Sequence, residues 1–311
     1  MEQCLKLRAH GKINLGLDVT GRREDGYHLV RMIMQSVGLY DTVELTAEKT
    51  PGIRLETSLP FLPVDETNLA YRAAKLLMDE FDVREGVHIR IGKFIPVAGG
   101  MAGGSSDAAA VLHGINRLFS LGVDRKGLME RGLKLGADVP FCILRGTALA
   151  EGIGEVLTSL PPMMSCPILI AKPGFSVSTR EIYTKLDSVM PAAEDHSPEA
   201  QAFRAMQPDT EGLIRALHEQ NLEMLLDSMG NTLECVTSPM HPEIHRLEER
   251  MEALGAARAM MSGSGPTVFG IFTDPEKAKA ALEVLRAEAE TLQVKQVYLT
   301  EPYQPRTGRK N

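Results

Sequence analysis

The chain has 311 residues, with 34 Lys and Arg against 41 Asp and Glu, which gives a formal net charge of −7. This length provides ample core for one large domain or two, and the acidic balance argues against nucleic acid or an anionic membrane as the main partner. The four cysteines are scattered without a C-x-x-C pair, and there is neither a membrane-spanning apolar run nor a signal-peptide core at the N-terminus, so we expect a cytoplasmic protein.

Strand-like segments dominate the beginning of the chain, and helices follow them. Apolar alternation predicts strands at residues 4–9, 13–20, 29–38 and 42–47, with a further strand around Val87, Ile89 and Ile91. Helical spacing predicts helices at residues 67–81, 105–118 and 125–135. A Leu-Pro-Pro stretch at 160–162 is the expected boundary, so the first predicted domain covers residues 1–160.

The second half mixes strands and helices, which suits a two-layer α+β domain at residues 161–300. Strands are predicted at residues 168–172, 258–261, 267–272 and 293–299, and helices at 245–254 and 275–290. Residues 188–200 read as a loop rich in Pro, Ala and acids. The polar end, residues 301–311, is predicted to be a flexible tail.

A run of small residues between the strand at 87–91 and the helix at 105–118 is the most informative segment. Its four glycines expose backbone N–H groups, and Ser105 is a natural N-cap of the helix that follows. Free N–H groups at a helix start form an anion site, typically for phosphate, although an ordinary Gly-rich turn is the alternative. The predicted phosphate-binding residues are Pro96, Val97, Ala98, Gly99, Gly100, Met101, Ala102, Gly103, Gly104, Ser105 and Ser106.

The better-known phosphate motifs do not fit this loop. A P-loop needs a Gly-Lys-Ser/Thr ending, and a dinucleotide fingerprint needs G-x-G-x-x-G, whereas here the glycines are paired and no lysine is present. A protein kinase would also have V-A-I-K and H-R-D segments, which are absent. Another kind of nucleotide site is therefore expected.

Three further segments accompany the loop: AHGKINLGLDV at 9–19, LGADVPFC at 135–142 and MSGSGPTVFG at 261–270. In this order and spacing the four segments resemble the signatures of the GHMP superfamily of small-molecule kinases. The resemblance covers residues 6–299 and implies a two-domain α+β fold with an active-site cleft between the domains. RREDGYH at 22–28 is most similar to members that phosphorylate 4-diphosphocytidyl-2-C-methyl-D-erythritol. Met101 and Ala102 stand where many relatives have Leu and Gly.

Phosphoryl transfer to an alcohol needs a group that takes or orients the hydroxyl proton. Asp138, held in a turn between Gly136 and Pro140, is the best candidate carboxylate, and by resemblance it is the family's base. Lys12 would pair with Asp138 and favour a developing alkoxide. A turn aspartate and a solvated strand lysine are the alternatives, and abstraction of the proton and mere orientation of the hydroxyl both remain open.

Asp107 is expected in the first turn of its helix, beside the proposed phosphates. There a carboxylate stabilises the helix dipole, and this role is favoured over ligation of Mg²⁺. The Ser105 or Ser106 hydroxyl is a second candidate ligand of the phosphates or the metal.

The resemblance also implies the acceptor and purine contacts. Tyr27 would stack on the cytosine, His28 would hydrogen-bond it and Tyr183 would form a second aromatic wall, against the alternatives of a half-buried core tyrosine and a surface histidine. Asn14 and Thr179 would be polar contacts of the substrate. Asn68 resembles a purine contact, but an ordinary helix N-cap is an equal alternative.

The resemblance implies an ATP- and Mg²⁺-dependent kinase of the 2-hydroxyl of 4-diphosphocytidyl-2-C-methyl-D-erythritol, in the non-mevalonate isoprenoid pathway. Another kinase of the superfamily, acting on homoserine, mevalonate or a sugar, is less favoured because a small acceptor needs no base-stacking wall. A non-catalytic nucleotide-binding regulator is the third hypothesis. Small molecules are the expected partners, and the protein is expected to be a monomer or a homodimer.

Overall fold

The computed structural model describes residues 4–191 and 194–305, and the chain divides into two compact units. The first unit contains the residues up to 11 together with 39–97 and 102–145. The second contains residues 12–38, 98–101 and those from 146 onward. Two long strands, β1 (Cys4–Arg22) and β2 (His28–Glu48), contribute residues to both units.

In the first unit, β4 (Gly86–Gly92) lies between β2 and β3 (Gly52–Thr57). It pairs antiparallel with β2 and parallel with β3. The alternating residues Val87, Ile89 and Ile91 are buried, as expected where a sheet packs a core on one face. The predicted strand before the Gly-rich loop is therefore confirmed.

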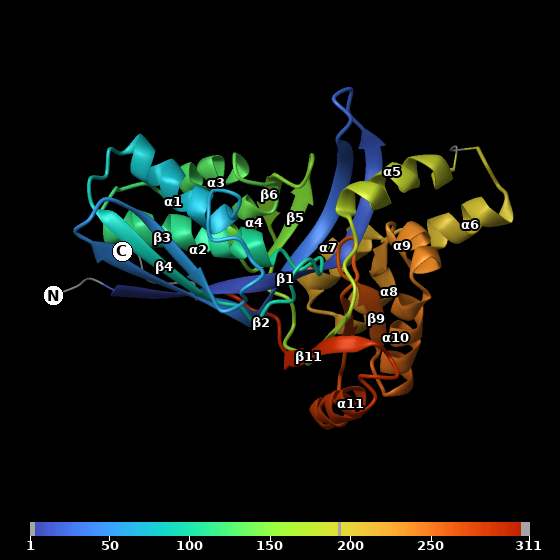
Figure 1. Cartoon of the computed structure of the whole chain (residues 1–311). Helices are drawn as coiled ribbons and strands as arrows, with labels where there is room; N and C mark the ends of the chain where they lie inside the picture. The colour runs from blue at the N-terminus through green and yellow to red at the C-terminus, as the bar shows by residue number, and fades with distance from the viewer. Residues whose placement is uncertain (1–3, 192–193, 306–311) are drawn as a thin grey trace. The chain divides into compact units, whose positions relative to one another are not determined.

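The helices of the first unit pack on this apolar face (Figure 1). They are α1 (Leu69–Glu80), α2 (Gly103–Leu118), α3 (Arg125–Leu133) and α4 (Val139–Leu144). α2 approaches the sheet closely at Gly114, where a Cβ atom would lie 2.5 Å from the Cδ1 atom of Leu45. A run of small residues after the loop, Ala108 to Ala110, is also fully buried and lets the helix sit tightly in the core.

The second unit contains an antiparallel sheet in the order β11-β7-β10-β9. Its strands are β7 (Ile168–Pro173), β9 (Arg258–Met261), β10 (Val268–Ile271) and β11 (Val294–Thr300). Helices α10 (Pro242–Ala253) and α11 (Pro275–Ala287) pack on these strands. Every residue of the central strand β7 is buried, as is usual for a strand covered on both sides.

Among the described residues, the second unit also contains three short strands, β5, β6 and β8, and five further helices. β5 (Thr147–Glu151) pairs with β2 and β6 (Val156–Ser159), and β8 (Gly230–Asn231) pairs parallel with β1. Its other helices are α5 (Thr179–Val189), α6 (Pro198–Ala205), α7 (Thr210–Glu219), α8 (Leu222–Ser228) and α9 (Glu234–Met240).

The predicted elements differ from the structure at identifiable places. The strands expected at 4–9 and 13–20 form one continuous strand, and so do those at 29–38 and 42–47, because residues 10–12 and 39–41 keep the strand conformation. The sequence reading did not include β3, β5, β6 or α4, and α6 begins inside the expected loop.

Part of the predicted tail is tied to the second unit. Pro302 forms a bridge with Val37, and the Tyr303 N–H donates to the Ser36 carbonyl over 2.8 Å. Gln304 adds a 2.9 Å hydrogen bond to the Thr147 hydroxyl. Residues 306–311 lie outside the described residues, and the domain boundary at 160 stays a prediction.

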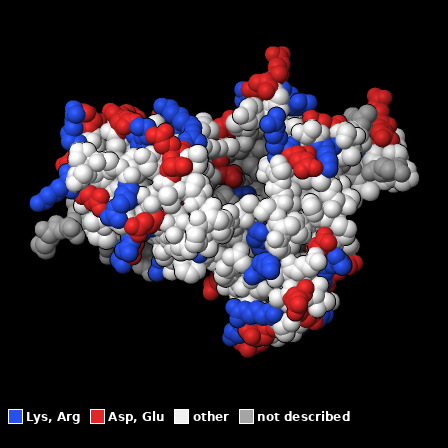
Figure 2. Space-filling model, in the orientation of Figure 1, with Lys and Arg blue, Asp and Glu red and all other residues white. Residues whose placement is uncertain are grey.

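Charged side chains are mixed over the visible surface. On the face in Figure 2, acidic and basic atoms alternate, for example over α11 at the lower edge. Among the described residues no helix is long and apolar enough to cross a membrane.

Candidate active site

The Gly-rich loop between β4 and α2 takes left-handed backbone conformations at Ala98, Gly100 and Ala102, with φ of 49°, 75° and 56°. The glycine is needed at position 100, because a Cβ atom there would collide with the Ser262 carbonyl oxygen. Ala102 adopts the left-handed region despite its Cβ atom and is the N-cap of α2. The prediction that Ser105 caps this helix is wrong: Ser105 lies in its first turn, and no side chain caps it.

The backbone of this loop presents many free donors. Within the described residues, no N–H group from Ala98 to Ser105 donates a hydrogen bond, whereas the Ser106 N–H bonds the Ala102 carbonyl at 2.8 Å. Unpaired N–H groups at a helix start carry partial positive charge and favour a bound anion. Such a backbone can hold an anion, and the binding of phosphate by this loop stays a prediction.

The Lys12 ammonium contacts the middle of this loop. Lys12 lies on β1 with 5% of its surface exposed, and its Nζ atom donates to the Gly100 carbonyl at 2.9 Å and to Asn14 Oδ1 at 2.7 Å. An ammonium group has three N–H donors, so one remains for a ligand. The structure thus joins two of the predicted site residues to the loop.

The turn between β9 and β10 holds the same carbonyl from the other side. The Ser262 hydroxyl donates to the Gly100 carbonyl at 3.1 Å, and the Asn231 amide donates to the Met261 and Gly263 carbonyls at 2.9 and 2.8 Å. This segment is a Gly-rich hairpin turn between two antiparallel strands, and it also contacts the loop. Three separated parts of the chain therefore meet at one peptide group.

Two half-buried glutamates, Glu234 and Glu248, lie near this turn. Glu234 Oε1 accepts the Met261 N–H at 2.7 Å. Burial raises the pKa of Glu234 to about 7 and that of Glu248 to about 9, and for Glu248 the nearby Glu234 adds to the shift.

Asn14 is completely buried, and both ends of its amide are engaged inside the protein. Its Oδ1 atom accepts from Lys12, and its Nδ2 atom lies 3.4 Å from the Met32 sulfur. This places Asn14 as a support for the Lys12 ammonium. Its predicted contact with the diphosphate or sugar alcohol stays a prediction.

Asp138 precedes α4, but its side chain does not cap that helix. Within the described residues its carboxylate makes no hydrogen bond and no ion pair, so it is available to a substrate. Asp138 belongs to the first unit and Lys12 to the second, and their pairing stays a prediction.

His28, one of the predicted cytosine contacts, pairs with an aspartate that the sequence reading overlooked. His28 Nε2 lies 2.6 Å from Asp187 Oδ1, and Arg22 Nη1 lies 3.0 Å from Asp187 Oδ2. The rings of His28 and Tyr183 are 4.9 Å apart, while Tyr27 is 60% exposed. Asp187 follows Tyr183 by four residues on α5, a spacing that puts both on one helix face and offered a signal.

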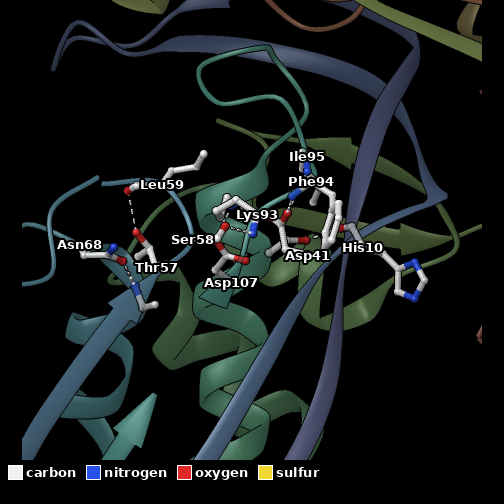
Figure 3. Close-up of polar contacts among 12 residues, drawn as sticks. His10, Asp41, Thr57, Ser58, Leu59, Asn68, Lys93, Phe94, Ile95 and Asp107 are labelled. Atoms are coloured by element: carbon white, nitrogen blue, oxygen red, sulfur yellow. Dashed lines mark hydrogen bonds and ion pairs between the residues drawn. The ribbon is translucent and has the colours of Figure 1, made fainter. Parts of the chain in front are cut away.

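The remaining predicted contacts are also engaged within the protein. The Thr179 hydroxyl lies 2.8 Å from that of Ser264, which belongs to the β9–β10 turn. Asn68 is the N-cap of α1: its Oδ1 accepts from the Ala70 N–H at 2.9 Å, and its Nδ2 donates to the Pro63 carbonyl at 2.8 Å (Figure 3). The N-cap alternative for Asn68 is therefore present, and its purine contact stays a prediction.

Asp107 does not lie in the first turn of α2, where no acidic residue is found. It lies one residue deeper, and its Oδ2 atom accepts from Lys93 Nζ at 2.6 Å (Figure 3). Burial raises the pKa of Asp107 to about 8, against the opposing effect of Lys93. The expected dipole role is replaced by a buried contact with a lysine, because the side chain turns inward to the core.

The matched family models cover both parts of the chain. Residues 68–146 match the GHMP kinases N-terminal domain, and residues 213–291 match the GHMP kinases C-terminal domain. A homoserine kinase structure from Cytophaga hutchinsonii, 19% identical, shares the fold with a TM-score of 0.75 over 96% of this chain and 95% of its own. Fold and site thus define a GHMP kinase, as the sequence motifs predict.

Proteins with higher sequence identity to this chain identify the family within the GHMP kinases. The chain is 49% identical over 303 residues to the 4-diphosphocytidyl-2-C-methyl-D-erythritol kinase of Lachnospira eligens, which covers 97% of this chain and 100% of the relative. A crystal structure of 4-(cytidine 5′-diphospho)-2C-methyl-D-erythritol kinase is 33% identical, with a TM-score of 0.77 over 96% of this chain and 100% of its own. The chain belongs to the 4-diphosphocytidyl-2-C-methyl-D-erythritol kinase family. It is a small-molecule kinase with ATP as its co-substrate.

Proposed function

We propose that the protein transfers the γ-phosphoryl group of ATP to the 2-hydroxyl of 4-diphosphocytidyl-2-C-methyl-D-erythritol, in the non-mevalonate route to isoprenoid precursors. The observation that carries the proposal is the loop at residues 98–105, whose N–H groups have no partner among the described residues. The Lys12 ammonium beside it supplies full positive charge, which a transferring phosphoryl group requires.

The chemistry assigns Asp138 to the acceptor hydroxyl. The acceptor oxygen bonds to the γ-phosphorus as the bond between that phosphorus and the β,γ-bridging oxygen breaks, and ADP leaves with the electron pair. The hydroxyl proton passes to the Asp138 carboxylate, which is free of other partners within the described residues. Lys12 stabilises the negative charge that develops on the transferred group.

The cytidine end of the acceptor is assigned to Tyr27, His28 and Tyr183. Tyr27 is exposed and free to stack on a base, and His28 already lies against the Tyr183 ring. Stacking of a base on an aromatic side chain stabilises a complex by about 1–3 kcal/mol. Thr179 and Asn14 complete this assignment as polar groups near the substrate.

Mg²⁺ is assigned to the co-substrate, bound by the phosphate oxygens of ATP. Two of the protein oxygens considered as ligands are engaged inside the protein, because Asp107 Oδ2 accepts from Lys93 and the Ser106 hydroxyl donates to the His10 carbonyl. The Ser105 hydroxyl makes no hydrogen bond within the described residues and stays a candidate ligand of the phosphates or the metal. Across residues 4–191 and 194–305, no three His, Cys, Asp or Glu side chains form a cluster suited to a metal.

The test is an incubation of the purified protein with Mg-ATP and the proposed acceptor, followed by phosphorus NMR. A new phosphomonoester resonance that appears together with ADP supports the proposal. The same reaction with homoserine or mevalonate as acceptor is the control, and phosphorylation of either one instead contradicts the assigned substrate. ADP formed at the same rate without any acceptor contradicts phosphoryl transfer to an alcohol.

A further inference from the structure

A buried lysine and two aspartates lie at the base of the Gly-rich loop (Figure 3). Lys93 follows β4, Asp41 lies on β2 and Asp107 lies on α2. Their side chains are 4%, 0% and 6% exposed. Lys93 Nζ contacts Asp41 Oδ2 and donates to Asp107 Oδ2 at 2.6 Å. We call these three residues the loop clamp.

The positions of the clamp residues in the chain give them a specific relation to the loop. Lys93 stands just before Pro96, where the loop begins, and Asp107 stands just after Ser106, where it ends. Their contact therefore joins the two ends of the loop through side chains. Gly103 lies beside this contact: a Cβ atom there would lie 3.4 Å from Lys93 Nζ and would crowd Ile95 Cγ2 at 3.1 Å.

Asp41 fixes the segment that enters the loop. Its Oδ1 atom accepts the Phe94 N–H at 2.5 Å and the Ile95 N–H at 2.8 Å, while its other oxygen contacts Lys93. The Lys93 N–H also donates to the Ser58 hydroxyl at 2.9 Å. Three consecutive N–H groups before the loop are thus held in place by side chains.

A cluster of buried charges adds little net free energy to the stability of a fold. Buried charges lose their hydration, and apolar residues of similar size often stabilise a core as well or better. What charged hydrogen bonds add is a defined direction and distance between the groups they join. The clamp thus supplies fixed geometry at the two points from which the phosphate-binding backbone starts and ends.

We propose that Lys93, Asp41 and Asp107 are positioning residues for ATP: they hold both ends of the loop so that its N–H groups are arranged for the phosphates before the nucleotide binds. The inference rests on the proposed function, because it assumes that the loop binds ATP. None of the three residues needs to touch the nucleotide. Their effect is to lower the conformational cost of binding, the general benefit of a preorganised site.

The deciding variant is Asp107→Ala, which frees the end of the loop while Lys93 keeps Asp41 as a partner. We expect the dissociation constant of ADP, measured by calorimetry, and the KM for ATP to rise by about tenfold. The KM for the acceptor stays within about twofold of the wild-type value. Asp107→Asn retains an oxygen that accepts from Lys93, so it restores most of the nucleotide affinity.

A matched control removes a contact of the same unit that lies away from the loop. Glu80→Ala breaks the pairing of Glu80 with Arg131, whose Nε donates to Glu80 Oε2 at 3.0 Å. This variant is expected to lower thermal stability without changing the affinity for ADP. If Asp107→Ala does not fold, Lys93→Gln is tested by the same measurements, since it removes the charge that joins the two acids.

A folded Asp107→Ala protein, or Lys93→Gln in its place, that binds ADP within about twofold of wild type overturns the inference. An equal rise in the KM values of both substrates also overturns it, because that result indicates a general loss of structure. A wild-type protein that binds no ADP instead contradicts the proposed function. The two failures are therefore distinguishable.

Discussion

The Lys12 ammonium donates to the carbonyl oxygen of Gly100 over 2.9 Å, so the cation of the site is fixed to the backbone of the loop that it serves. We expect Lys12→Met to lower kcat by roughly 10²–10³, because a preorganised positive charge is lost. Lys12→Arg should not restore activity, since a planar guanidinium does not replace a compact ammonium group. Steady-state kinetics measure both effects, and Lys6→Met, on the exposed part of the same strand, is the control. Half of the wild-type rate in Lys12→Met would remove Lys12 from catalysis.

Asp138→Asn is expected to lower kcat by about 10²–10⁴ and to leave ATP binding unchanged, since it removes the group that accepts the proton. Stability should change little, because the Asp138 side chain caps no helix. Asp124 provides the matched control: it caps α3 by accepting from the Gly127 N–H at 2.7 Å. Asp124→Ala should lose about 1 kcal/mol of stability and keep its rate. Similar kinetics for the two variants would contradict the assignment.

Gly100→Ala tests the close approach of the loop to the β9–β10 turn. The new Cβ atom would collide with the Ser262 carbonyl, so we expect weak ATP binding and a lower melting temperature. Gly122 has a similar φ, 72° against 75°, but has no atom within 4 Å of the Cβ position. Gly122→Ala should therefore show only the backbone cost, about 1–2 kcal/mol, with normal kinetics. Equal ATP affinities in the two variants would contradict a tight contact at Gly100.

Asp187→Ala is expected to raise the KM for the cytidyl substrate by about tenfold, because His28 and Arg22 lose their shared carboxylate. The KM for ATP should not change. Glu181→Ala is the control on the same helix, since Glu181 pairs with Lys185 at the surface. An unchanged acceptor KM in Asp187→Ala would place the cytosine elsewhere.

The half-buried pair Glu234 and Glu248 predicts a stability that depends on pH. Burial raises the pKa of Glu248 from 4.5 to about 9, where Glu234, Glu252 and Arg258 also act on it. Between these two values the folded protein holds more protons than the unfolded chain, so the free energy of unfolding falls as pH rises. The contribution of Glu248 to the free energy of unfolding is complete below pH 4.5 and is lost as the pH rises through about 9.

Urea unfolding at about pH 6 and about pH 9 measures this loss. Glu248→Gln cannot ionise and should flatten the decline, whereas Glu249→Gln, 65% exposed on the same helix, should not. A parallel decline in the wild type and Glu248→Gln would show that another group is responsible.

Local patterns predicted the strand before the Gly-rich loop and the helix after it. The alternation of Val87, Ile89 and Ile91 and the glycines after them are signals that need no tertiary information. The start of α2 was misjudged because the structure puts Ala102 in the left-handed region, which residues with a Cβ atom seldom adopt. Ser105, three residues later, then looked like the better cap.

The loop clamp could not be predicted from the sequence, for a different reason. Asp41 and Lys93 are 52 residues apart in the chain, and neither belongs to a motif. Only the pairing of β2 with β4 brings them together, and the sequence does not state which strands are neighbours. Lys12 and Asp138 were instead identified by the motifs that contain them. A motif does not give the distance between two side chains in the folded protein.

The convergence of positions 12, 100 and 262 on one carbonyl oxygen has a consequence for biosynthesis. A ribosome completes the Gly-rich loop long before it reaches Ser262, so the loop leaves the exit tunnel without the hydroxyl that holds Gly100. The nascent chain therefore passes more than half of its synthesis with an unfinished nucleotide site. Premature termination before position 262 leaves a polypeptide that contains every residue of the loop but lacks the Ser262 contact with Gly100.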